Sequence, residues 1–75
     1  MSLEVWAAID SPAVRHQLVE IIAASSLREL AREWGFESEE DARRYVHGPL
    51  AARIRKEAGE DGIDFLTVKC DERGI

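Results

Sequence analysis

The sequence predicts an all-α protein, a small bundle of four to five short helices over residues 1–59 with a C-terminal extended segment over residues 60–75. Helix-capping signals recur along the chain, and hydrophobic residues fall at helical spacing between them. The chain has 75 residues and is 45% hydrophobic, which suits one small core and is too short for two.

Hydrophobic spacing near the N-terminus predicts the first helix, and a capping residue followed by a proline predicts the second. Residues 1–10 suit a short helix with Leu3 and Trp6 inward. Asp10 or Ser11 can cap the next helix, with Pro12 at its first position, where a missing N–H costs nothing. The hydrophobic residues that follow at helical spacing are Val14, Leu18, Ile21 and Ile22.

Two capping boxes predict the next two helix starts, Ser26 with Glu29 and Ser38 with Asp41. Gly35 between them is typical of a helix end, and Phe36 can fold back onto the last turn.

Glycines and a proline predict the remaining helix boundaries. We expect His47 and Gly48 to end one helix, Pro49 to open the last, and Gly59 to stop it.

Residues 63–70, IDFLTVKC, alternate like a single β-strand and are rich in β-branched and aromatic residues. A lone strand leaves its backbone groups unpaired, so it needs an edge on another chain or on a second copy. One hypothesis is therefore strand addition to a partner through Phe65, Leu66 and Val68. The alternative is a tail that packs irregularly or as a helical turn on the bundle.

The net charge of −5 is unevenly distributed along the chain. Residues 43–56 carry five basic side chains and no acidic one, whereas the segments on both sides are acidic. The basic residues are Arg43, Arg44, Arg53, Arg55 and Lys56. They can form a nucleic-acid patch with Tyr45 and His47 beside it, or they can pair with neighbouring carboxylates. The acidic net charge favours pairing.

Residues 25–46 place Ala31, Gly35, Phe36 and Arg44 at spacings that resemble the helix-turn-helix of AraC-type regulators. That resemblance implies a DNA-reading helix after residue 38. The three carboxylates that open this helix would be repelled by phosphates, which weighs against DNA reading.

Residues 1–41 resemble leader segments of ribosomally synthesised, post-translationally modified peptides, of the nitrogen-fixation-cluster and nitrile-hydratase-related type. The resemblance rests on an Asp-Pro-type helix start followed by a leucine, and on an Ala-x-x-x-Gly-Phe pattern followed by acids. It implies a helical handle for a modifying enzyme and a modified C-terminal segment. Thr67 and Cys70 would then be the candidates for a thioether bridge.

No residue pattern indicates an enzyme, a cofactor or a metal site. Two histidines and one cysteine stand at no recognised ligand spacing. A single cysteine excludes an intrachain disulfide and, with no apolar run of membrane-spanning length, suggests the cytoplasm. The sequence therefore predicts a small acidic protein-binding module. One form of such a module is a leader-like precursor or adaptor that a modifying enzyme recognises. The alternatives are a helix-turn-helix nucleic-acid regulator and a small acidic inhibitor or oligomer-forming protein of a mobile element, for which a homodimer is one expected form.

Overall fold

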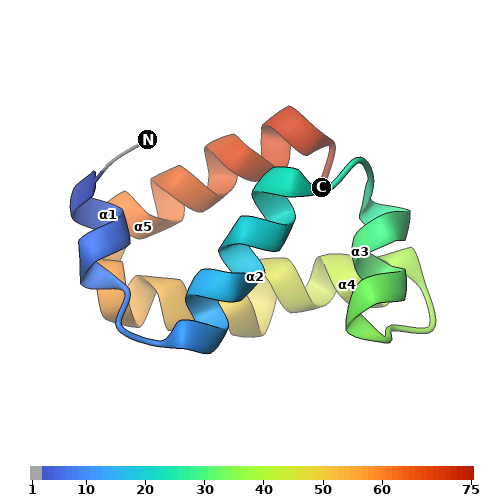
Figure 1. Ribbon diagram of the computed structural model, residues 1–75, viewed down its shortest axis with the longest axis horizontal. Helices are drawn as coiled ribbons and strands as arrows, with labels where there is room; N and C mark the ends of the chain where they lie inside the picture. The colour runs from blue at the N-terminus through green and yellow to red at the C-terminus, as the bar shows by residue number, and fades with distance from the viewer. Residues whose placement is uncertain (1–2) are drawn as a thin grey trace.

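The computed structural model describes residues 3–75, and these residues form helices with no strand (Figure 1). The helices are α1 (Leu3–Ala8), α2 (Pro12–Ala23), α3 (Leu27–Trp34), α4 (Glu39–Tyr45) and α5 (Ala51–Arg73), with a π-helical turn, Val46–Leu50, between α4 and α5. The all-α prediction is confirmed. None of these helices is both long and apolar enough to cross a bilayer.

Helix starts lie where the serine caps predict them. Each capping hydroxyl accepts a hydrogen bond from the backbone N–H three residues ahead: Ser11 from Val14 (3.3 Å), Ser26 from Glu29 (3.2 Å) and Ser38 from Asp41 (3.1 Å). Gly35 ends α3 in the left-handed conformation (φ 77°), and the N–H of Phe36 donates to the carbonyl of Ala31 at 2.8 Å. These short-range signals were sufficient to define α2, α3 and the start of α4.

The predicted break at His47 and Gly48 is wrong, because the chain stays helical through a π-helical turn that contains Pro49. The buried residues here follow a strict four-residue repeat: Ala42, Val46, Leu50 and Ile54, with Ala58 partly buried. In an unbroken α-helix such a repeat drifts by about 160° over 16 residues. The π-helical turn has more residues per turn than an α-helix, so it rotates this row of buried side chains back towards the core.

The extended segment predicted for residues 60–75 is also wrong. The chain turns at Gly59 and returns as a helix (Figure 1), so α5 has a first arm, residues 51–58, and a second arm, residues 60–73. The second arm buries Gly62, Phe65, Leu66 and Cys70 at helical spacing. β-branched and aromatic residues indicated a strand, but burial of this helical face overrides their local preference.

The core is formed mainly by α2 and the two arms of α5. Leu18, Ile21 and Ile54 are each 0% exposed in one cluster that also contains Phe65 and Leu66. Arg73 closes the second arm by donating from Nε and Nη2 to the carbonyl of Ile22 at 2.8 and 2.6 Å. In α1, Val5 is the buried residue and Leu3 is 80% exposed, which corrects the predicted inward position of Leu3.

Replacement of Gly59 by alanine is expected to lower the free energy of unfolding by about 1–3 kcal/mol. Gly59 has φ 64° and ψ −156°, a backbone conformation that is essentially confined to glycine. Gly48→Ala is the matched control, because an added Cβ meets no atom within 4 Å at either site and Gly48 has no positive φ. Urea denaturation of both variants measures the difference. Equal stability of the two variants would contradict this account of the turn.

Candidate functional site

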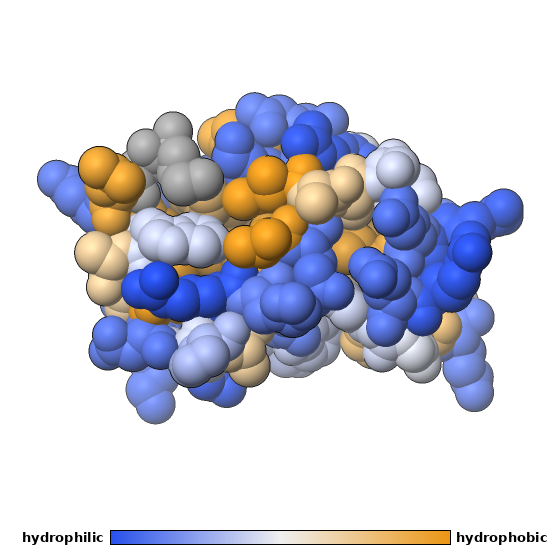
Figure 2. Space-filling view, viewed as in Figure 1, coloured by the Kyte–Doolittle hydropathy of each residue, from blue (hydrophilic) through white to orange (hydrophobic). Residues whose placement is uncertain are grey.

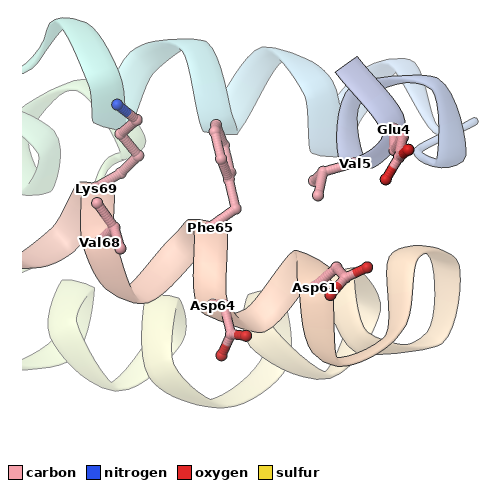
Figure 3. A pocket seen from close by; sticks show the side chains of 7 residues that line it. All are labelled: Glu4, Val5, Asp61, Asp64, Phe65, Val68 and Lys69. Carbon is pink, nitrogen blue, oxygen red and sulfur yellow. The ribbon is translucent and has the colours of Figure 1, made fainter. Parts of the chain in front are cut away.

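Two of the three apolar residues predicted to bind a partner, Phe65 and Val68, line a surface groove between α1 and the second arm of α5 (Figure 3). The third, Leu66, is 2% exposed and belongs to the core. The strand prediction placed Leu66 and Val68 on one face, but in the helix they point in different directions. The helical form thus separates the binding residues from the core residues of this segment.

The groove has a volume of about 420 Å³ and is open to solvent. Its apolar part is formed by Val5, Phe65 and Val68, of which Val68 is 52% exposed. Leu3 lies exposed on the same short helix as Val5. Figure 2 shows hydrophobic side chains on the surface at the α1 end, and a separate group over α2 at the middle of the view, both bordered by hydrophilic ones.

The groove carries three carboxylates, Glu4, Asp61 and Asp64, and one ammonium group, Lys69. Within residues 3–75, the side chains of the three acids form no hydrogen bond and no ion pair. The Nζ atom of Lys69 lies 5.7 Å from the centroid of the Phe65 ring and 3.5 Å from Oε2 of Glu72. The groove is therefore predominantly negative, and its one cation, Lys69, lies beside the carboxylate of Glu72.

Sequence reasoning missed the charged residues of the groove and Val5. Asp61, Asp64, Phe65, Val68 and Lys69 follow the spacing i, i+3, i+4, i+7, i+8, which places them on one helix face. The sequence contains this spacing, but a strand over residues 63–70 would not place these side chains on one face.

Three of the four arginines in the basic segment lie beside carboxylates. Arg43 and Arg44 lie 3.7 and 3.6 Å from oxygens of Glu40, and Arg55 lies 3.2 Å from Glu60. Arg53 is exposed. These pairs match the interpretation in which the basic segment is neutralised locally, although they are surface pairs that contribute little to stability.

Glu57, the acidic residue that directly follows the basic segment, accepts hydrogen bonds from backbone N–H groups. Its Oε1 atom accepts hydrogen bonds at 3.0 Å from the N–H groups of Asp10 and Ser11, just before α2. A carboxylate at a helix start is favoured by the helix dipole. Glu57 thus ties the first arm of α5 to the start of α2.

The aromatic residues within residues 25–46 pack on one another. Trp34, Phe36 and Tyr45 have ring centroids 5.5–6.5 Å apart. Trp34 donates to Glu20 at 3.0 Å, and Tyr45 donates to Gln17 at 2.9 Å, so the cluster fastens α3 and α4 to α2. These contacts assign the aromatic cluster a packing role between three helices.

The two residues predicted for thioether chemistry have different surroundings. Thr67 is exposed, whereas Cys70 is 1% exposed. Burial, and next the negative charge of Asp71, raises the pKa of Cys70 to about 11. A thioether forms from a thiolate, and the burial of Cys70 in this fold disfavours the thiolate.

The part of the chain covered by residues 3–75 brings no three His, Cys, Asp or Glu side chains together in a way that would hold a metal ion. Met1 and Ser2, with which the leader resemblance begins, lie outside the described residues. Comparison of the chain with protein-family models, curated proteins and solved structures found no match. The resemblance to leader segments stays a prediction.

Proposed function

We propose that this protein is a non-enzymatic binding module that holds an α-helical segment of another protein in the groove between α1 and the second arm of α5. The bound segment has an apolar stripe and a net positive charge. The observation that carries the proposal is the pairing of an exposed apolar surface, Val68 beside Phe65, with three carboxylates that have no partner among the described residues.

The helical form of the partner follows from what the groove offers. Binding by β-strand addition needs a sheet edge, and residues 3–75 contain no strand. The second arm instead presents a face with the i, i+3, i+4, i+7 spacing of a helix that packs against another helix. A helix laid into the groove can bury Val68 and the exposed edge of Phe65.

The charge of the groove favours a cationic partner over a nucleic acid, which would bring phosphates to the carboxylates of Glu4, Asp61 and Asp64. A cationic segment gains attraction from them and a faster association rate.

The single free cysteine, Cys70, is compatible with a reducing compartment. We therefore propose that the module acts in the cytoplasm.

The test is binding of a labelled amphipathic peptide of about 18 residues, five helical turns, with a leucine stripe flanked by lysines. We expect Asp61→Lys to weaken binding about tenfold in fluorescence anisotropy, because it replaces attraction by repulsion at the groove. Asp71→Lys is the matched control, since Asp71 is exposed on the same arm but does not line the groove. Equal affinities for the two variants, or equal binding of a scrambled peptide of the same composition, would contradict the proposal.

A further inference from the structure

The charges of the groove are arranged in order along its length. Figure 3 shows Glu4 and Asp61 at the α1 end, Phe65 in the middle, and Val68 and Lys69 at the opposite end. Asp61 and Lys69 are eight residues apart on one helix face, which corresponds to about 12 Å along the helix axis. The groove is therefore negative at its α1 end, and Lys69 is the one cation that lines its other end.

Lys69 is held in its position by two contacts. Its side chain is 22% exposed, its Nζ atom lies 5.7 Å from the centroid of the Phe65 ring, and Oε2 of Glu72 lies 3.5 Å from the same atom. The ring attracts the cation, and the aliphatic part of the side chain covers apolar surface. The ammonium group of Lys69 therefore lies at the Phe65 edge of the groove, beside the carboxylate of Glu72.

We propose that the groove selects its partner helix by a two-sign charge pattern, and this inference rests on the proposed function. The partner carries basic residues that face Glu4 and Asp61, apolar residues that cover Phe65 and Val68, and an acidic residue that faces Lys69. The basic and acidic residues stand about seven or eight positions apart, because that spacing spans the same two helical turns.

Specificity follows from the repulsion at the Lys69 end. A uniformly basic helix would place a cation against the ammonium group of Lys69, which lies beside the Phe65 ring in the groove. Specific interfaces commonly exclude wrong partners through such a like-charge contact. If net charge alone decided binding, this acidic protein would prefer the uniformly basic helix. If the charge pattern decides, it prefers the helix with both signs, so the two hypotheses predict opposite preferences.

The experiment compares two labelled peptides of about 18 residues with the same leucine stripe. The patterned peptide has lysines at one end and a glutamate about seven residues further on, and the uniform peptide has a lysine in place of that glutamate. We expect the protein to bind the patterned peptide about tenfold more tightly, and we expect Lys69→Glu to reverse the preference. Lys56→Glu, an equal charge change at an exposed position on the first arm, is expected to keep it.

Two results would overturn the charge pattern and leave helix binding at the groove in place. One is tighter binding of the uniform peptide by the unmodified protein. The other is the same peptide preference in Lys69→Glu and Lys56→Glu. Failure of both peptides to bind would overturn the proposed function together with the pattern.

Discussion

Deletion of Pro49 is expected to leave the protein folded, with a free energy of unfolding within about 1 kcal/mol of the unmodified value or higher. A deletion inside a helix rotates all that follows by about 100° and normally moves core residues to the surface. Here it shortens the step from Val46 to Leu50 to three residues, so that the buried stripe fits an uninterrupted α-helix. It also removes a proline, which lacks the N–H of the helical hydrogen bond.

Deletion of His16 is the control for this prediction. His16 is exposed in α2 between the buried residues Val14 and Leu18, and α2 has no π-helical turn that could absorb the change. We expect this variant to lose about 3 kcal/mol or more, a large part of the stability of a domain of this size. Circular dichroism and urea denaturation compare the two. Equal losses of stability would show that the π-helical turn does not set the register of the stripe.

The free energy of unfolding is expected to fall by up to about 3 kcal/mol between pH 9 and pH 11 through Cys70 alone. Burial raises the pKa of this thiol from 9.0 to about 11 in the folded protein, with a smaller contribution from the charge of Asp71. The unfolded chain therefore releases the proton first. The stabilisation is complete below pH 9 and is lost as the pH rises through 11.

Cys70→Ala isolates this effect, because the other groups that titrate at high pH remain in both proteins. Its absolute stability is lower, since the substitution leaves a small cavity in the core. The slope of stability against pH between 9 and 11 is the measured quantity. Identical slopes for the two proteins would contradict a raised pKa at Cys70.

The parts of the fold that the sequence predicts correctly are those encoded by short-range chemistry. Ser11, Ser26 and Ser38 each satisfy a backbone N–H three residues away, and Gly35 provides the left-handed conformation that ends α3. These contacts lie within one turn of the residue that makes them, so the sequence alone contains the information.

The second arm of α5 could not be predicted in this way. Ile63, Phe65, Thr67 and Val68 favour a strand locally, but burial of Phe65, Leu66 and Cys70 in the core cluster that includes α2 decides for a helix. Pro49 presents the same difficulty, since proline commonly opens a helix and here lies inside a π-helical turn. In both places tertiary packing decides the structure.

The candidate site was predicted in part for the same reason. Phe65 and Val68 were identified by their apolar character, which holds in either secondary structure. The roles of Asp61, Asp64 and Lys69 depend on the helix that places them beside Phe65, and Val5 and Glu4 come from the other end of the chain. A contact between residues about 60 positions apart leaves no pattern in a single sequence.

The central claim, that a cationic amphipathic helix binds between α1 and the second arm of α5, is tested most directly by a titration followed in ¹⁵N–¹H correlation spectra. On addition of the patterned peptide, we expect the largest shifts at Glu4, Val5 and residues 61–69, with small shifts over residues 43–56. Shifts centred on Arg43, Arg44 and Arg53, or spread evenly over the surface, would contradict the claim.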